Sequence, residues 1–417
     1  MDLFVSLHPA PKAWLLNSSL APHIDAFVEH LRRGRYAGST TSKYGAGIAH
    51  FAHWMTQCSV PVQLLNEQTV DQFLNSHLPC CDCPMPVQRV HGDLRAALGH
   101  LLVVLRVQGV IAEPPQPVGD IVDELRRYDE HMHKARGLSA DTRRGRLRTV
   151  QRLLLHKFAD CPVVIGELQP TDVRQFLAEQ LERCGTASNT AALASALRAY
   201  FRYRATCGDR VHGLLGVISS PAHWSLASLP RGLKPAEVDR LLKSFTSSVP
   251  SHRRGYAIVR CALDMGLRSG EIAKLQLADI DWCAGTVMLK RTKSLRQDIL
   301  PLPAVTGRAL ADYIRHERPT TTNPALFVRC MAPRDQPIGV DAVHRVIRDA
   351  YRRIGLTHGR SHALRHTLAC RLLDHGSSLK EVADVLRHRS LNTSLIYAKI
   401  DTPRLTAVAL PWPGSTT

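Results

Sequence analysis

The sequence has no long apolar run, and its first residues do not resemble a secretion signal. No stretch of about 18 apolar residues, the length needed to cross a bilayer as a helix, occurs in it. The opening MDLFVSLHPAPKAWLLNSS has no basic region followed by a long apolar segment. We therefore expect a cytoplasmic protein with no membrane partner.

Cysteine is present, but in no recognisable framework. The 11 cysteines are scattered and odd in number, which favours reduced thiols over paired disulfides. One cluster, LPCCDCP, holds Cys80, Cys81 and Cys83, and Cys58 or His77 offers a further zinc ligand. No second pair of the CxxC type follows at the distance found in zinc fingers, so the spacing predicts no metal site and no cofactor.

Acidic side chains are few. The chain has 36 Asp and Glu against 54 Lys and Arg, a formal net charge of +18. Such a surface repels basic partners and attracts polyanions, so nucleic acid is the first candidate partner. Charge alone leaves open a basic surface without a special partner. The 417 residues are too many for one compact core, and two or three domains are expected.

The first half of the chain repeats one plan, in residues 39–112 and 137–209. Small polar residues precede a helical pattern in each copy, SKYGAGIAHFAHWM in the first and RRGRLRTVQRLLLHKF in the second, so both helices should have side-chain caps. The segments LNEQTVDQFLNSHL and LQPTDVRQFLAEQL follow, and both copies close with a helix rich in Leu and Ala. We expect two similar helical domains whose apolar positions form their cores.

Proline-containing stretches separate the copies from each other and from the rest of the chain. They are EPPQPVGD at 113–120 and SSPAHWSLASLPRGLKP at 219–235. We therefore expect an N-terminal helical module at 1–115, a second helical domain at 116–225 and a third domain at 226–417. The second copy is rich in arginine, and five of these residues are expected to contact DNA phosphates, a solvated charged face being the alternative: Arg143, Arg144, Arg146, Arg198 and Arg202.

The third domain begins with helical patterns and one stretch of strands. The helical segment RRGYAIVRCALDMG ends at a glycine, which puts Arg268 at a helix end and Glu271 on the first turn of the next helix. The segment GTVMLKRTKSLRQDILPLP then alternates like a β-hairpin. Lys293 lies at its turn, an exposed place from which a proton donor can reach a ligand.

Two further motifs follow the hairpin. The segment SHALRHTLACRLLDHG sets His362 three residues before Arg365, so both can share one face of a helix. The segment LRHRSLNTSLIYAK places His388 nine residues before Tyr397. Each residue alone is most simply a core or surface residue, and only the set carries a functional interpretation.

These motifs, taken together, resemble the catalytic domain of the tyrosine recombinase family, also called the phage integrase family. The resemblance covers roughly the last 190 residues and rests on their order and spacing. The matching segments are GLRSGEI around Arg268, TKSLRQ around Lys293, SHALRHT around His362 and Arg365, and LRHRSLNTSLIY ending at Tyr397.

The resemblance also implies a fold. We expect a mainly α-helical protein with SAM-like core-binding domains, here duplicated, followed by a mixed α/β catalytic domain with a small β-hairpin. One core-binding domain is usual in the family, and we interpret the second copy as that domain. The first copy is then an added module for DNA or protein contacts, which favours a mobile element of the transposon type.

The resemblance assigns a role to each motif residue. Attack of a phenol on a phosphodiester builds negative charge on the non-bridging oxygens, and guanidinium groups neutralise it without a metal ion. The product is a 3′-phosphotyrosyl bond and a free 5′ hydroxyl, which permits rejoining without ATP. The implied roles are charge neutralisation by Arg268 and Arg365, a general acid at Lys293, a proton acceptor at His362, a phosphate hydrogen bond from His388 and the nucleophile at Tyr397.

Four neighbours of these residues have expected supporting roles. Glu271 is expected to orient Arg268 or to cap its helix. Arg291 and Arg296 flank Lys293 and are expected to contact DNA, solvated charges on the hairpin being the alternative. The residue before His388 is often Gly in the family, but here it is Arg387, which we expect either to grip phosphate or to shift the loop.

The expected partners follow from the resemblance. They are double-stranded recombination sites and further copies of this chain, as a dimer or tetramer, with accessory recombinases a further possibility. The segment AKIDTPRLTAVAL after Tyr397 is a plausible docking helix. Two rival functions stay open at this point: a type IB topoisomerase-like relaxing enzyme, and a DNA-binding or architectural protein that has lost catalysis.

Overall fold

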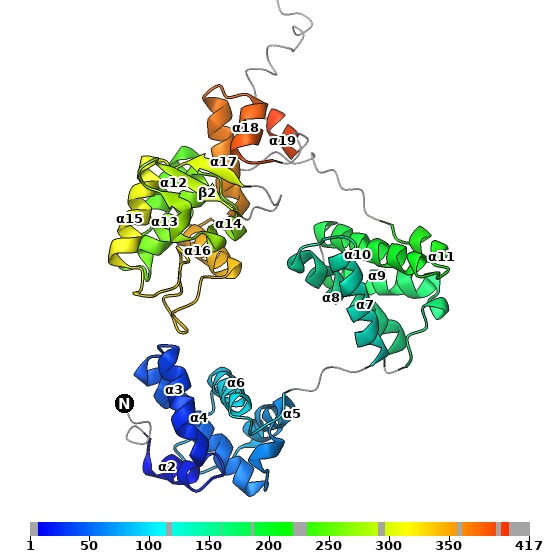
Figure 1. The fold of residues 1–417 in the computed structure, drawn as a ribbon, viewed down its shortest axis with the longest axis vertical. Coiled ribbons are helices and arrows are strands. Elements are labelled where there is room, and N and C mark those ends of the chain that lie inside the picture. The colour runs from blue at the N-terminus through cyan, green and yellow to red at the C-terminus, as the bar shows by residue number, and fades with distance from the viewer. Residues whose placement is uncertain are drawn as a thin grey trace, which may run out of the picture. The chain divides into compact units, whose positions relative to one another are not determined.

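The computed structural model describes residues 7–113, 119–159, 161–184, 187–219, 232–290, 297–356, 361–388 and 393–399. It is mainly helical, with one three-stranded antiparallel sheet, which confirms the expected fold class (Figure 1). Residues Glu113–Ala227 form one compact unit, and the chain on either side of them forms the other. Among the described residues, no helix is both long and apolar enough to span a bilayer.

The N-terminal module has a core of its own. Phe51, Phe73 and Leu98 are fully buried at its centre. Asn66 caps one helix, because its side chain accepts a hydrogen bond from the backbone N–H of Thr69 at 3.0 Å. Its helices are α2 (Pro9–Leu16), α3 (Ile24–Arg33), α4 (Gly38–Gln57), α5 (Glu67–Gln72) and α6 (His91–Val107), with a π-helical turn η3 (Phe73–His77) and a 3-10 turn η4 (Leu78–Cys80) between α5 and α6.

The unit Glu113–Ala227 has a similar series of helices around its own core. Val173 and Phe176 are buried in it as Val70 and Phe73 are buried in the first module. Its helices are α7 (Asp120–Lys134), α8 (Ala140–Phe158), α9 (Pro170–Cys184), α10 (Ala187–Thr206) and α11 (His212–Gly216).

The expected caps of the two long helices had different outcomes. Ser139 caps α8, since its side chain accepts from the backbone N–H of Thr142. The cap expected at Ser39–Thr41 is wrong: α4 begins earlier, at Gly38, and no side chain caps it. The Thr41 hydroxyl instead donates to the carbonyl of Ala37 at 3.3 Å, from inside the helix.

Helix α7 was not predicted, because most of its surface is charged. It nevertheless contributes a buried carboxylate to the core of its unit. Glu124 is 1% exposed, and it accepts hydrogen bonds from the Tyr200 hydroxyl and from the Arg204 guanidinium, both at 2.9 Å. This network ties α7 to α10, so a charged residue holds the two helices together.

We expect Glu124→Ala to lower the free energy of unfolding of this unit by about 3 kcal/mol, because it leaves the Arg204 charge without its buried partner. Chemical denaturation of the full chain, followed by circular dichroism, measures the change. Glu130→Ala is the matched control, since Glu130 pairs with Lys134 on the exposed face of the same helix, and no measurable change is expected. Equal effects of the two substitutions would contradict the role assigned to Glu124.

The C-terminal part joins helices to the small sheet. Its strands are β1 (Ile280–Asp281), β2 (Thr286–Leu289) and β3 (Asp298–Pro301), in the order β1-β2-β3. The predicted hairpin is confirmed in β2 and β3, which pair antiparallel with Val287 opposite Leu300; the short β1 was not predicted. The helices are α12 (Pro235–Lys243), α13 (His252–Asp264), α14 (Ser269–Lys274), α15 (Ala304–His316), α16 (Val340–Arg353), α17 (Ser361–Asp374), α18 (Leu379–Val385) and α19 (Leu395–Ala398).

Helix α17 links two apolar clusters of this part. Leu364, near its start, belongs to the large cluster that α13 and β2 also build. Ala369 and Leu373, further along, form a small cluster with Val382 and Tyr397. Helices α17, α18 and α19 therefore pack against one another (Figure 1), and this arrangement brings together motifs that are far apart in the sequence.

Candidate functional site

Arg268 lies at the junction between α13 and α14. Its backbone N–H and its guanidinium both donate to the Glu271 carboxylate, each at 2.8 Å. Burial alone would raise the pKa of the Glu271 carboxyl, but Arg387, the Arg268 N–H and the Arg268 charge hold this pKa below its ordinary value. Glu271 therefore stays ionised, and it both holds the Arg268 guanidinium and caps α14 through the Arg268 backbone N–H.

Arg365 is buried on α17 and is held by backbone carbonyls. It is 4% exposed, and its guanidinium donates to the carbonyls of Gly266 and Leu386. Burial lowers its pKa to about 9, and the charges of Arg268 and Arg387 add to this shift. The Arg365 guanidinium is thus still charged at neutral pH. Because Arg268 and Arg387 are also positively charged, their surroundings favour the binding of an anion.

Arg387 belongs to the same cluster. Its side chain is 5% exposed and pairs with Glu271 at 2.8 Å, so in this conformation its guanidinium is held inside the protein by that carboxylate. Its φ is 55°, in the left-handed region where glycine is favoured and where another residue costs about 1–2 kcal/mol. The ion pair helps to offset this cost.

Tyr397 is buried on the short helix α19. It is 2% exposed, and its hydroxyl lies 2.8 Å from Nδ1 of His366. Burial raises the pKa of the Tyr397 phenol to about 12, against the opposing effect of the Arg365 charge. The phenol is therefore protonated at neutral pH and is in position to donate to His366.

His388 lies beside Tyr397 with its ring nearly parallel to the phenol, at an interplanar angle of 5° and a centroid distance of 6.4 Å. Its Nδ1 is 2.6 Å from the Ser394 hydroxyl. Burial lowers the pKa of His388 to about 4, and the charges of Arg365 and Arg268 add to this shift. The imidazole is therefore neutral at pH 7.

The structure thus brings together four of the six motif residues predicted to be catalytic. Arg268, just before α14, and Arg365, on α17, lie close to His388, just after α18, and to Tyr397, on α19. His362 is on the first turn of α17 but is exposed, whereas Arg365 is buried. Lys293, like Arg291 and Arg296, lies outside the described residues.

The arginines of the second repeat have mixed surroundings. Arg144 and Arg202 are exposed on α8 and α10, as phosphate contacts require. Arg143 pairs with Asp129 at 3.2 Å, Arg146 lies near the Tyr128 hydroxyl, and Arg198 donates to the carbonyl of Ile218 at 2.7 Å. Arg143 and Arg198 therefore already have protein partners, and the exposed Arg144 also pairs with Asp141, at 3.2 Å.

Two residues of the site were missed in the sequence. The motifs predict no role in the chemistry for His366, but its Nδ1 contacts the Tyr397 hydroxyl. Ser394 was not considered, but its hydroxyl contacts His388. No spacing rule connects His366 with a tyrosine 31 residues later on another helix, so only the packing of α17 against α19 reveals the contact.

Comparison with known proteins gives matches along most of the chain. Residues 231–404 match the phage integrase family, and residues 125–206 match the N-terminal SAM-like domain of phage integrases. The Sinorhizobium fredii protein y4rA, which is named as an integrase/recombinase, is 33% identical over 401 residues, covering 95% of both chains. The tyrosine recombinase XerD of Yersinia pestis is 31% identical over 239 residues, covering 57% of this chain and 79% of that protein.

Solved structures show the same fold. The XerH site-specific recombinase bound to a palindromic difH substrate aligns with a TM-score of 0.55 at 19% identity, covering 84% of this chain and 99% of that chain. A lambda integrase dimer bound to a core site aligns with a TM-score of 0.52 at 17% identity, covering 66% of this chain and 94% of that chain.

The fold, the full-length relative and the domain matches together define the class: the chain belongs to the phage integrase family of tyrosine recombinases. It is an enzyme of the site-specific recombinase type.

Proposed function

We propose that this recombinase cleaves and rejoins duplex DNA through a 3′-phosphotyrosyl bond made by Tyr397. The observation that carries the proposal is the convergence of two arginines, a neutral histidine and a tyrosine from four separate segments of the chain. A phosphate bound between Arg268 and Arg365 would receive planar guanidinium donors, which neutralise charge as the pentacoordinate transition state forms. Because guanidinium groups do this, the step requires neither a metal ion nor ATP.

His388 is proposed to bind the same phosphate. The Ser394 hydroxyl is in position to donate to Nδ1 of His388, at 2.6 Å. In a neutral imidazole the proton then lies on Nε2, which becomes a donor to a phosphate oxygen. Ser394 would thus set the tautomer that the phosphate needs. Lys293 is proposed as the general acid for the leaving 5′ oxygen, on the ground of its motif.

The Tyr397 proton has two proposed acceptors, His362 and His366, which are one turn apart on α17. His366 is the one whose Nδ1 lies 2.8 Å from the hydroxyl. Burial lowers the pKa of His366, and the charges near it, on His362 and Arg365, act in the same direction. A neutral His366 can accept the proton, and it does so without leaving its place on the helix.

We expect His366→Asn to slow DNA cleavage about 100-fold, because Asn keeps a polar atom near the Nδ1 position but cannot take up a proton. The wild-type rate should rise with pH through the His366 pKa, since only the neutral ring accepts a proton, and this rise should be weaker in the variant. Single-turnover cleavage between pH 5 and 8 measures both effects. His362→Asn is the matched variant: if it slows cleavage and His366→Asn does not, His362 is the base.

Duplex DNA and further copies of the chain are the proposed partners. The relatives of known structure are described as bound to DNA sites, one of them as a dimer. The net charge of +18 and the exposed Arg144 and Arg202 of the second repeat support binding to a polyanion. We propose a dimer or tetramer acting on two sites, with accessory recombinases as further partners. The docking helix expected after Tyr397 lies mostly outside the described residues.

The test is to recover the covalent intermediate. The full chain is incubated with sheared genomic DNA of its source organism, the mixture is denatured, and DNA that remains covalently bound to protein is isolated and sequenced. Nicked duplexes of the recovered sequence then accumulate the adduct, and mass spectrometry of its peptides identifies the modified residue. A nucleotide joined to the Tyr397 oxygen through its 3′ phosphate supports the proposal. A different modified residue, or DNA cleaved without an adduct, would overturn it.

A further inference from the structure

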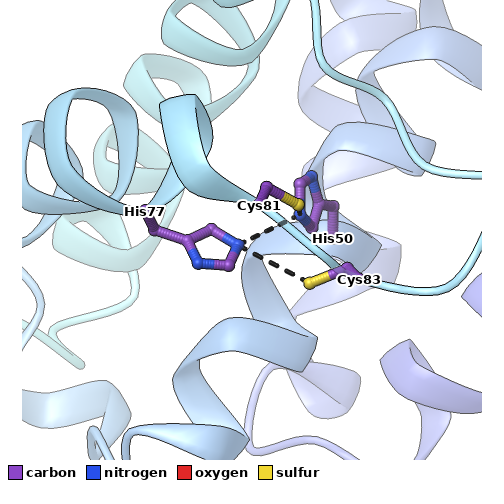
Figure 2. Close-up of side chains that lie close together, drawn as sticks. All are labelled: His50, His77, Cys81 and Cys83. Atoms are coloured by element: carbon purple, nitrogen blue, oxygen red, sulfur yellow. Dashed lines mark hydrogen bonds between the residues drawn. The ribbon is translucent and has the colours of Figure 1, made fainter.

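The N-terminal module contains a cluster of side chains that the recombinase site does not use. Figure 2 shows His50, His77, Cys81 and Cys83 pointing toward one another. One nitrogen or sulfur atom from each residue lies within 4.8 Å of the other three. His50 comes from α4, His77 ends the π-helical turn η3, and the two cysteines follow the 3-10 turn η4. Three short segments thus meet at this point.

The distances between these atoms fit one tetrahedral ion. Nε2 of His50 is 3.4 Å from Nε2 of His77 and 3.3 Å from Sγ of Cys81. Nε2 of His77 is 3.6 Å from Sγ of Cys83. Around zinc, with bonds of about 2.1 Å to nitrogen and about 2.3 Å to sulfur, tetrahedral geometry separates two nitrogens by about 3.4 Å and nitrogen from sulfur by about 3.6 Å.

The two imidazoles are also oriented as metal ligands usually are. His50 is fully buried, and its Nδ1 lies 2.9 Å from the carbonyl of Gln88, to which it donates. This bond leaves a lone pair on Nε2 of His50, directed at the cluster. The ring of Phe73 stacks on His77 and meets His50 edge-on, at centroid distances of 5.3 and 5.1 Å, and so fixes both planes.

Hydrogen bonds among the four side chains explain the arrangement less well. The two thiols could each donate to one imidazole, since Cys81 faces His50 and Cys83 faces His77. Both Nε2 atoms would then be acceptors, and two lone pairs would face each other at 3.4 Å. A cation at the centre of the cluster removes this repulsion, because all four atoms then donate electron pairs to it.

We propose that His50, His77, Cys81 and Cys83 form a structural zinc site in the N-terminal module. Two thiolates and two imidazoles are a ligand set that zinc prefers, and two thiol protons leave when the ion binds. The four protein ligands complete the tetrahedron, so the ion holds structure and activates no water. It would join α4 to the segment between η4 and α6, a stretch where the described chain has few regular backbone hydrogen bonds.

His50 is the ligand that sequence spacing could not supply. It precedes His77 by 27 residues and lies on a different helix, whereas Cys58, which the sequence offered as an alternative, is exposed at the end of α4. Cys80 is also outside the set, because its thiol donates to the carbonyl of Ser76 at 3.0 Å and the residue is exposed. This difference between adjacent cysteines makes a sharp test possible.

The test measures metal in the full chain, purified without chelator from cells grown with added zinc. Elemental analysis should find about one zinc ion per chain in the wild type. Cys81→Ser and Cys83→Ser should each lose most of this zinc and melt at a lower temperature, whereas Cys80→Ser, the matched control, should keep both the zinc and the melting temperature. Equal zinc loss in Cys80→Ser and Cys81→Ser would overturn the proposal.

A second measurement uses only the wild-type chain, so it does not depend on the folding of variants. Zinc is removed with a chelator under reducing conditions and replaced by Co²⁺. The intense visible absorption of tetrahedral cobalt and a thiolate-to-cobalt charge-transfer band are the expected result, and added zinc should abolish both. Three results would contradict the site. They are weak absorption typical of octahedral cobalt, a wild-type chain that contains no zinc after purification, and a disulfide between Cys81 and Cys83 in the freshly purified chain.

Discussion

Replacing Tyr397 by phenylalanine is expected to abolish the covalent adduct with DNA while leaving DNA affinity unchanged. The substitution removes one oxygen, and the buried ring stays in the small apolar cluster of α17, α18 and α19. Without a phenol no phosphotyrosyl bond can form, so the loss should reach the detection limit. The loss of the contact with His366 should also lower the free energy of unfolding by about 1 kcal/mol.

The nicked duplexes recovered with the wild type provide the assay, with adducts resolved by denaturing electrophoresis and affinity measured by gel shift. Tyr351→Phe is the matched control. Tyr351 is also buried in the C-terminal part, but its hydroxyl has no hydrogen-bond partner in the described structure, so removing it should change neither adduct formation nor affinity. An adduct that survives in Tyr397→Phe would place the nucleophile elsewhere.

Replacing Arg365 by lysine is expected to slow cleavage by about 1000-fold. Lysine keeps the positive charge, so a lower cleavage rate shows that the planar shape of the Arg365 guanidinium is required. A guanidinium can bond the carbonyls of Gly266 and Leu386 and still present N–H groups to a phosphate, whereas an ammonium is a single point charge on a shorter chain. Part of the effect should appear as a lower melting temperature, because these carbonyls lose a donor.

Arg371→Lys is the control for this substitution, since Arg371 lies on the same helix, has no role in the proposed site and should tolerate the change. Single-turnover cleavage of the nicked duplex and thermal unfolding should be measured on both variants. If Arg365→Lys melts earlier but cleaves within about tenfold of the wild-type rate, Arg365 is an anchor for three segments and not a group that stabilises the transition state.

The parts of the fold that could be predicted are helices and strands whose residues follow a periodic pattern of apolar and polar side chains. Apolar residues at helical spacing predicted α4, α8 and α10, and the alternation around β2 and β3 predicted the hairpin. Helix α7 escaped because its apolar stripe is narrow and its buried Glu124 gives no sequence signal of burial. Strand β1, with two residues, is too short to leave a periodic pattern.

The site could be predicted as a set of residues but not as a set of contacts. Order and spacing of motifs identified Arg268, Arg365, His388 and Tyr397, because those motifs are specific in combination. The pairing of Arg387 with Glu271 could not be foreseen, since it joins residues 116 apart. Contacts between distant segments depend on tertiary packing, which a local pattern does not record.

The cluster of Arg268, Arg365 and Arg387 with Glu271 has a consequence for the chemistry proposed here. Three guanidiniums and one carboxylate leave an excess of two positive charges. An intact phosphodiester carries one negative charge, and the pentacoordinate species formed during attack carries two. The excess charge of the site therefore matches the pentacoordinate species better than the intact phosphodiester. The site stabilises the transition state more than the bound substrate, and this difference lowers the barrier to cleavage.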